Sequence, residues 1–286
     1  MRLRAICAVA LLAAASCRPQ PQPARPALWE ITGPNNQRGW LFGTIHSLST
    51  PAQWHSAVLD KNLAASDQLV LEIAAADEDQ RTAATFARLQ HAAGLLPLPE
   101  RINPELRPAL AKLLYDNHLD VGSYTTTKTW AAALILAQLT HKAGEAENGI
   151  DRALIAAMPH KPRGELEGVE RQLAIFDSLP EESQRAMLTS MLDGSENNDD
   201  DSKLEEGWRK GDMGLIDHAT YTGMLTDPGL HQALYVDRNL NWAKQIEAML
   251  KAGKHPFVAV GAAHMAGEQG LPALLAKDGL TVKRVQ

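Results

Sequence analysis

Apolar residues recur along this chain at two alternating spacings, which predict strands and helices in turn. The runs "GWLFGTI" (39–45) and "DQLVLEI" (67–73) are short and almost continuously apolar, as buried strands are. Residues 50–66, between them, carry apolar side chains at helical spacing. A strand, a helix and a second strand in succession typically build a parallel sheet, so we expect this unit to begin one.

The C-terminal third of the chain repeats this pattern. A long helical pattern covers residues 229–253, and the apolar run "PFVAV" (256–260) follows it. A glycine turn, a helical pattern over 271–279 and a short closing strand over 281–285 complete the chain. The two ends of the sequence therefore predict similar strand-helix-strand units.

The residues after the first unit are mostly helical in pattern. From about Asp77 to Ala157 the chain is rich in alanine, with the clearest helical spacing at 103–119 and 129–144. Asn103 followed by Pro104 is typical of a helix start. We expect this part of the chain to be a large helical insertion.

A further strand and two helices follow the insertion in the pattern. Residues 160–167 predict a strand that returns the chain to the sheet, and residues 168–192 predict two helices separated near Pro180. The whole pattern predicts an α/β fold whose central sheet is built from the N- and C-terminal strand-helix-strand units, with the large helical insertion between them. The length of 286 residues allows one large domain or two small ones, and we expect one, over residues 28–286.

The most polar stretch of the chain, "DGSENNDDDSKLEE" (193–206), predicts a solvated loop. Its side chains alternate as the first ligands of a calcium loop do, at Asn197, Asp199 and Asp201. However, Ser202 stands where such a loop needs glycine, and Trp208 stands where it needs a bidentate glutamate. We therefore expect no calcium site here.

The first 17 residues predict an export signal and not a part of the fold. Arg2 and Arg4 precede an unbroken apolar run that is too short to span a bilayer. The small residues "AAAS" then lead to Cys17, which resembles the lipobox where bacterial lipoproteins are cleaved and lipidated. Ordinary cleavage close by is the alternative. In both cases we expect export to the bacterial cell envelope, either as a membrane-anchored lipoprotein or into the periplasm.

The residues that follow the signal predict a tether. Residues 18–27 include "RPQPQPARP", whose proline spacing is typical of an extended, semi-rigid linker and suits a lipid anchor on Cys17. Cys7 lies inside the expected signal, so the exported chain keeps at most one cysteine and cannot form an internal disulfide. Its stability must come from burial.

Charge and composition exclude some classes of partner and of protein but do not indicate a substrate. The formal net charge is -6, and it becomes about -8 once the signal, with its two arginines and no acids, is removed. No basic stripe is present, so we expect no nucleic-acid partner. Since 45% of the residues are hydrophobic and 22% are charged, the chain is an ordinary globular protein. Its substrate must be argued from a site.

Two matching turns carry the candidate chemistry. Gly43 and His46 end the first predicted strand as "GTIH", and Gly261 and His264 follow "PFVAV" as "GAAH". Glycine permits the sharp turn, and open α/β sheets bind ligands beyond the carboxyl ends of their strands. A single histidine after a strand is more often a packed or surface residue. Two in matching contexts favour a functional site.

Glu72 interrupts the otherwise apolar strand "QLVLEI", on the same face as Val70. A buried carboxylate is costly without a partner, so this residue requires one. If this strand neighbours the first, Glu72 lies near His46. His46, Glu72 and His264 would then be a plausible ligand set for a divalent metal ion such as zinc, manganese or cobalt, with open positions for water.

Six ordered blocks of this sequence are similar to one known family. They are "LFGTIHS", "LVLEI", "ENGIDRAL", "GELEGVERQLAIFDSLP", "YVDRNLNWAKQIEAML" and "FVAVGAAHMAGEQGLPALLAKDGLTV". In this order, and over nearly the whole exported chain, they resemble the TraB/GumN family, also called the Tiki-like family. Animal members of that family are described as metal-dependent proteases with two Gly-x-x-His motifs and a conserved glutamate.

The resemblance implies a site formed by His46, Glu72 and His264. It also implies supporting roles for Glu167 and for Arg238 with Asn239. The residues by themselves leave alternatives open: Glu167 could be a further ligand, a general base or an ordinary surface glutamate. Arg238 could stabilise an oxyanion or form a structural salt bridge.

Asp151 has a simpler explanation than catalysis, because a carboxylate near a helix start interacts well with the free amides there. We therefore leave it out of the expected catalytic set, which is His46, Glu72, Glu167, Arg238 and His264.

Motifs of other enzyme classes are missing from the sequence: it contains no "HExxH", no Gly-x-Ser-x-Gly elbow and no phosphate loop. We therefore expect an exported metal-dependent hydrolase that acts on peptide bonds or on a small-molecule substrate. The ion would activate water, a carboxylate would accept the proton, and Arg238 would stabilise the oxyanion. The alternatives are a metal-independent hydrolase with histidine as general base, as in erythromycin-esterase-type relatives, and a non-enzymatic envelope binding protein.

Overall fold

The computed structural model of the protein describes residues 20–74, 78–140, 145–193 and 198–286. The expected signal peptide and Cys17 lie outside these residues. Within them, no helix is both long enough and apolar enough to cross a membrane.

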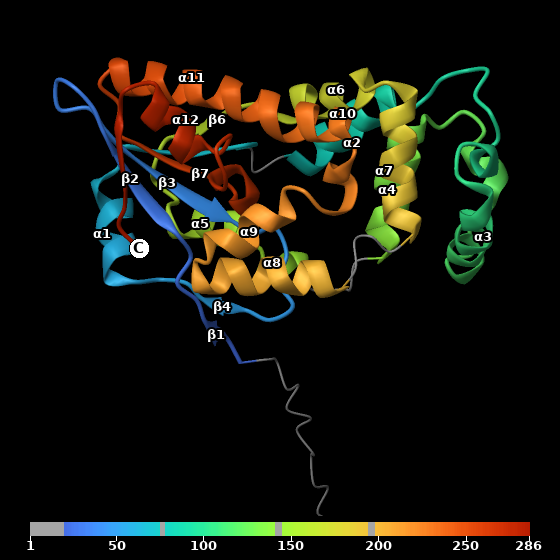
Figure 1. Cartoon of the computed structure of the whole chain (residues 1–286), viewed down its shortest axis with the longest axis horizontal. Coiled ribbons are helices and arrows are strands. Elements are labelled where there is room, and N and C mark those ends of the chain that lie inside the picture. Colours follow the sequence, from blue (N-terminus) through green and yellow to red (C-terminus); the bar gives the residue numbers. More distant parts are fainter. Residues whose placement is uncertain (1–19, 75–77, 141–144, 194–197) are drawn as a thin grey trace, which may run out of the picture.

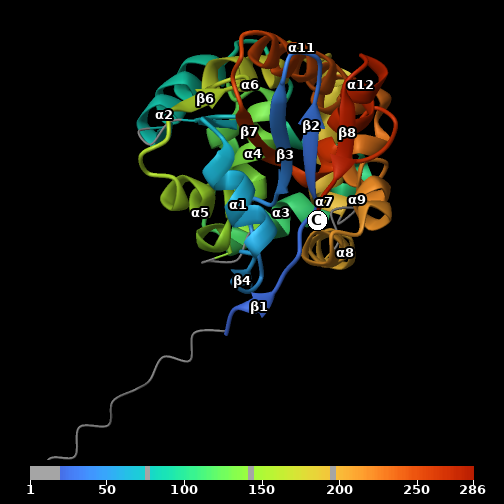
Figure 2. The ribbon, with the colours of Figure 1, turned by 90° about the vertical axis from the view of Figure 1, so that its left-hand side faces the viewer.

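A mixed sheet forms the centre of the fold (Figures 1 and 2). Its strands lie in the order β6 (Arg163–Glu165), β5 (Gln68–Leu71), β7 (Pro256–Gly261), β3 (Arg38–Thr44), β2 (Leu28–Thr32) and β8 (Thr281–Arg284). β6, β5, β7 and β3 run parallel, and β2 is antiparallel to both of its neighbours. The predicted α/β class and the central sheet built from both terminal units are confirmed. β2 was not predicted.

The two strand-helix-strand units interleave in this sheet. β7, from the C-terminal unit, lies between β3 and β5 of the N-terminal unit. In the β3–β7 register Trp40 lies opposite Phe257, and Thr44 lies opposite Gly261. The two parallel strands therefore end level with each other, and the turns after them leave the same edge of the sheet.

Side chains alternate along the strands and pack against a helical layer on each face of the sheet. Phe42 and Leu69 belong to the core that includes α1 (Ala57–Ala65) and α5 (Ile150–Ala157). Val70 and Val258 belong to the core beneath α11 (Asp237–Lys251) and α12 (Leu271–Lys277). Figure 1 shows α11 running along this second face. A side chain on the Val70 face therefore points toward α11.

The helical insertion forms a part of the molecule with its own apolar core, at the right of Figure 1. Its main helices are α2 (Glu78–Leu89), α3 (Arg107–Asp116) and α4 (Thr129–Thr140), and α6 (Val169–Ser178) and α7 (Glu181–Asp193) follow β6. The predicted start at Asn103 is confirmed, since its Oδ1 accepts the Glu105 N–H at 3.2 Å. The predicted break at Pro180 also separates two helices.

The described end of the acidic stretch differs from the prediction of a loop, and residues 194–197, with the expected calcium-loop position Asn197, lie outside the described residues. Residues from Asn198 onward form α8 (Asn198–Lys210), followed by α9 (Met213–Ala219), which begins at the capping residue Asp212. Trp208 explains the helix, because its indole is buried and Nε1 donates to the Gly43 carbonyl at 2.8 Å. Tertiary packing thus overrides the poor helix propensity of an Asp-rich sequence.

The expected tether is docked for more than half of its length. β1 (Gln22–Pro23) pairs in parallel with β4 (Ala52–Gln53), and Ala24 belongs to the core. The Arg25 N–H donates to the Arg209 carbonyl at 2.7 Å. The extended conformation that proline favours is therefore used for pairing from Gln22 onward, and the folded body begins there.

Candidate functional site

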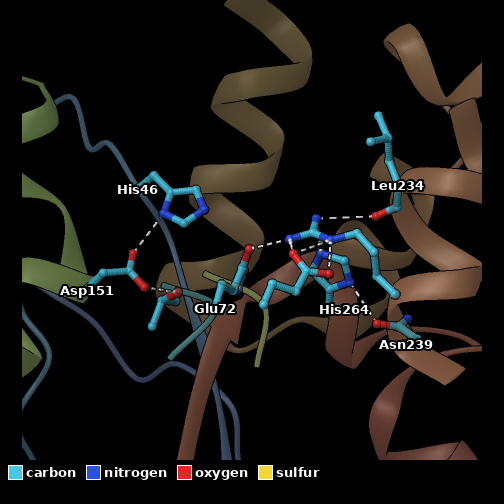
Figure 3. Close-up of polar contacts among 10 residues, drawn as sticks. His46, Glu72, Asp151, Leu234, Asn239 and His264 are labelled. Atoms are coloured by element: carbon cyan, nitrogen blue, oxygen red, sulfur yellow. Dashed lines mark hydrogen bonds and ion pairs between the residues drawn. The ribbon is translucent and has the colours of Figure 1, made fainter. Parts of the chain in front are cut away.

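The first Gly-x-x-His turn presents His46 just beyond the end of β3 (Figure 3). Its Nδ1 lies 2.9 Å from Asp151 Oδ2, and Thr44 Oγ1 donates to the other carboxylate oxygen at 2.8 Å. A carboxylate only accepts hydrogen bonds, so Nδ1 carries the proton, and Nε2 has no hydrogen-bond partner among the residues that the structure describes. The side chain of His46 is 69% exposed, so solvent or a substrate can reach Nε2.

The charge of His46 is strongly favoured by this pairing. The hydrogen bond to Asp151 outweighs desolvation, and together with the charges of Asp151 and Glu72 it raises the pKa of His46 from 6.5 to about 9. Solvent around the exposed ring screens these charges, so we expect the titration between those two values. A proton taken up by Nε2 is thus held well at neutral pH.

Asp151, which we did not expect in the catalytic set, lies in the site. It does lie in the first turn of α5, as expected, but its side chain points at His46 (Figure 3). The approach is built by its neighbours: the Ile150 N–H donates to the Ile45 carbonyl at 2.9 Å, and any side chain at Gly149 would collide with the His46 carbonyl. The glycine and the isoleucine of "NGID" are the signal that could have revealed the contact.

Glu72 directly follows β5 and points to the Val70 face, as predicted, and both carboxylate oxygens have partners. Oε1 accepts the Gly261 N–H at 2.7 Å, and Oε2 accepts from Arg238 Nη2 at 2.7 Å. Burial would raise the pKa of Glu72, but the basic groups around it and the Gly261 N–H lower it to about 2. Glu72 is therefore a buried anion, and a weak base.

Arg238 is the centre of the buried part of the site. Nη2 and Nε both donate to Glu167, at 3.0 to 3.2 Å, in addition to the bond to Glu72. Nη1 faces His264 Nε2 at 3.3 Å and the Leu234 carbonyl at 3.4 Å. All the N–H groups of a guanidinium are thus taken by protein acceptors. This geometry does not favour the predicted role in stabilising an oxyanion.

Glu167 is no surface glutamate, since its side chain is only 1% exposed. The Glu167 and Gly168 N–H groups both donate to the Glu72 carbonyl, at 3.1 and 3.2 Å, which joins the ends of β5 and β6. Gly168 has φ of 75°, a conformation that favours glycine, and it turns the chain into α6. Glu72 and Glu167 are therefore fixed relative to each other before Arg238 joins them.

His264, in the short η7 helix (Ala262–Met265), is buried, unlike His46. Its Nδ1 lies 2.7 Å from Asn239 Oδ1, and Asn239 Nδ2 donates to the Gln269 carbonyl at 2.8 Å. That carbonyl can only accept, so the amide orientation is set and Nδ1 of His264 must carry the proton. Burial lowers the pKa of His264 to about 3, so the ring is neutral with a lone pair at Nε2.

Gly261 is the point at which the exposed and buried parts of the site meet. A Cβ placed at Gly261 would lie 3.4 Å from Glu72 Oε1, 3.7 Å from His264 Cδ2 and 3.8 Å from His46 Nε2. The side chains that the sequence predicted as one site therefore converge, with His46 on the open side and Glu72, Glu167, Arg238 and His264 buried together.

The predicted metal set of His46, Glu72 and His264 does not fit this arrangement. Both oxygens of Glu72 are used, His264 Nε2 faces a guanidinium, and His46 is paired with Asp151. Across the described ranges, no three His, Cys, Asp or Glu side chains are grouped as a metal site. A permanent cation, Arg238, already donates to Glu72 and faces His264.

The helix that carries Arg238 contains an irregular turn. α10 (Pro228–His231), the π-helical η6 (Gln232–Val236) and α11 follow each other without a break. The predicted helix over 229–253 is confirmed, but the π turn was not foreseen. Such turns occur frequently at functional sites. Arg238 and Asn239 lie in the first turn after this one.

Comparison with known proteins gives consistent similarities over most of the chain. The sequence model of the TraB/PrgY/gumN family matches residues 27–284 of this chain. The proteins named YbaP of Shigella flexneri and of Escherichia coli (strain K12) are each 31% identical to it over 259 residues, which are 87% of this chain and 92% of theirs. No solved structure matches the chain.

Proposed function

This chain belongs to the TraB/PrgY/gumN family, and we propose that it is a hydrolase of peptide bonds in which His46 is the general base. The observation that carries the proposal is the His46–Asp151 pair, with Nδ1 fixed and Nε2 open to solvent beside a buried charged cluster. Peptide bonds are favoured because of the resemblance to the animal proteases. The geometry itself supports attack of water on any carbonyl that reaches Nε2.

The proposed reaction begins with neutral His46. Nε2 takes a proton from a water molecule as its oxygen forms a bond to the substrate carbonyl carbon. Asp151 stays ionised and stabilises the imidazolium, as the short contact to Nδ1 allows. The imidazolium then gives its Nε2 proton to the leaving nitrogen as the carbon–nitrogen bond breaks, which returns His46 to its neutral form.

The buried cluster contributes through its charge. Two carboxylates, Glu72 and Glu167, share one guanidinium, so the group carries a net negative charge. That charge lies beside His46, and the field of Glu72 adds to the raised pKa of His46. We propose that the cluster stabilises the imidazolium and holds the turn at Gly261 in place, with no contact to the substrate required.

Hydrolysis by the purified protein tests the proposal. A chain without residues 1–17 would be incubated with a mixture of short peptides, and new amino termini would be counted. We expect His46→Ala to abolish cleavage. His55→Ala is the matched control, because His55 is also an exposed histidine paired with an aspartate, Asp60 at 2.6 Å, outside the site. Equal cleavage by wild type and His46→Ala, or cleavage lost equally in both variants, would contradict the role of His46.

Cleavage and peptide binding by the same purified protein also test the predicted metal dependence and the alternative of an envelope binding protein. We expect cleavage to persist after dialysis against a chelator, because His46 and water suffice for the proposed reaction. Loss of cleavage that manganese, zinc or cobalt restores would instead support the metal-dependent reaction. Tight peptide binding without cleavage at any pH would support an envelope binding protein.

A further inference from the structure

Three acceptors from separate elements converge on the guanidinium of Arg238. Glu72 Oε2 and Glu167 Oε2 both accept from Nη2, at 2.7 and 3.0 Å, and His264 Nε2 lies 3.3 Å from Nη1. The side chains of Glu72 and Glu167 are almost fully buried, and His264 is buried as well. One cation thus lies among two carboxylates and an imidazole, and it offsets one of the two negative charges.

These acceptors are the ligand types of divalent-ion sites. Two carboxylates and one imidazole suit manganese or zinc, with water in the remaining positions. His264 even has the outer hydrogen bond of a metal-binding histidine, because Asn239 holds the Nδ1 proton and leaves the Nε2 lone pair pointing at the cation. The donors are therefore oriented for a cation.

We propose that Arg238 is a built-in cation that holds the place of a divalent metal ion, and that removing its guanidinium turns Glu72, Glu167 and His264 into a metal site. The inference concerns cation binding alone and does not depend on the proposed hydrolysis. It also differs from the ligand set predicted from the sequence, since Glu167 takes the place of His46.

An added metal ion cannot compete with Arg238 in the native protein. The guanidinium would have to leave both carboxylates, and its Cζ also lies 4.5 Å from the ring centre of Trp242. It is covalently attached, so its effective concentration in the pocket does not fall when the protein is diluted. Native protein should therefore purify without a stoichiometric ion in this pocket.

Removal of the guanidinium leaves two buried anions without a counter-charge, which favours uptake of an ion. The two carboxylate oxygens lie 2.7 and 3.0 Å from Nη2, whereas His264 Nε2 lies 3.3 Å from Nη1, so the three acceptors do not yet surround one point. Metal bonds are about 2.0 to 2.2 Å long, so the carboxylates have to close by roughly 1 Å and His264 by more. Glutamate side chains can make this movement by small rotations.

The test is metal binding by Arg238→Ala, measured by calorimetric titration with manganese and with zinc and by thermal unfolding. We expect this variant to bind one equivalent at least tenfold more tightly than native protein, and to unfold at a higher temperature with the ion. Arg238→Lys keeps a cation in the pocket and should show neither effect. Arg238→Ala combined with His264→Ala removes a ligand and should lose the gained affinity.

Arg238→Ala could fail to fold without an ion, so Arg238→Gln is a second variant, neutral and close in size. Recovery of either folded variant only when manganese or zinc is supplied also supports the proposal. A folded Arg238→Ala or Arg238→Gln protein with native affinity for both ions would overturn it. So would native protein that purifies with one tightly bound ion lost on Glu167→Gln substitution. None of these readouts requires cleavage of a substrate.

Discussion

At the scale of single residues, the glycines of the two Gly-x-x-His turns serve different physical purposes. A Cβ at Gly43 would lie 3.0 Å from the Cα of Ala262, so this glycine allows the second turn to pack on β3. A Cβ at Gly261 would meet only side-chain atoms of the site, at 3.4 Å or more, and its φ of -47° is open to any residue. Gly261 therefore leaves a space among the reactive groups.

Alanine substitutions at Gly43 and at Gly261 should have different effects on stability and on activity. Gly261→Ala should keep the native unfolding temperature but lower activity about a hundredfold, because the new methyl group fills the space beside His46 Nε2. Gly43→Ala should instead lower the free energy of unfolding by about 1–3 kcal/mol through overpacking against Ala262. Thermal unfolding and peptide cleavage measured on both variants check the pair. Full activity of Gly261→Ala would show that substrate does not enter this space.

The pH dependence of activity should follow His46, whose neutral form is the proposed base. Since Asp151 raises the pKa of His46 from 6.5 toward about 9, kcat/KM should increase with pH through that interval. Asp151→Asn removes the cause, so the rise should move to lower pH, with a limiting rate about a hundredfold lower. A profile that is flat between pH 6 and 9, or unmoved in Asp151→Asn, would exclude His46 as the base.

The His46–Asp151 pair should also make the stability of the fold depend on pH in a definite direction. A raised pKa means that the folded state holds the His46 proton more tightly than the unfolded state. The stabilisation is therefore complete below about pH 6.5 and is lost as pH rises through the raised pKa. The difference in unfolding temperature between native protein and Asp151→Asn should shrink over that interval.

Glu72→Gln tests the buried ion pair. The amide keeps the shape, but it leaves Arg238 with less compensating charge, so we expect the free energy of unfolding to fall by about 3–5 kcal/mol. Glu170→Gln is the control, because Glu170 pairs with Arg81 at the surface and its loss should leave unfolding almost unchanged. Denaturant unfolding of both variants gives the comparison. Equal stability of the two would mean that Glu167 alone neutralises Arg238.

At the scale of elements, the sequence predicted those whose pattern reflects burial. β3, β5 and β7 are apolar runs, and α3, α4, α6, α7 and α11 have helical spacing, so each was found. β2 is amphipathic, with Glu30 facing partly to solvent, and it follows prolines, so its pattern was weak. α8 depends on the burial of Trp208, which no local pattern reports.

The site shows the same limit of inference from sequence. Glu72 was recognisable because a carboxylate in an apolar strand requires a partner. The identity of that partner depends on how α11 packs on the sheet, so Arg238 could not be told from a metal ion. Asp151 is separated from His46 by 105 residues in sequence, and its place at a helix start already explained it.

The dependence of α8 on Trp208 gives a prediction at this scale. Trp208→Ala removes a buried indole and its bond to the Gly43 carbonyl, so we expect a loss of about 3–5 kcal/mol in the free energy of unfolding. Tyr115→Ala, at an 82% exposed position on α3, should change it by less than about 0.5 kcal/mol. Unfolding in denaturant measures both. A small effect of Trp208→Ala would show that other contacts hold α8.

At the scale of the whole molecule, the expected export and lipid anchor lead to a prediction of location. Cys17→Ser removes the residue that would carry the lipid, so the protein should move from the membrane fraction to the soluble fraction of the envelope. Fractionation followed by blotting measures this, and mass spectrometry of the first peptide locates the cleavage. Unchanged fractionation, or a first residue other than Cys17, would contradict a lipid anchor on Cys17.

The pairing of β1 with β4 limits how far such a protein could reach from its membrane. With the body folded from Gln22, the chain between it and Cys17 is residues 18–21, which span at most about 14 Å when fully extended. Figure 1 shows β1 and α11 on opposite sides of the body, so an anchored molecule would keep α11 turned away from the lipid. Its folded body would stay in a thin layer above the bilayer, and it would meet only those substrates that diffuse into that layer.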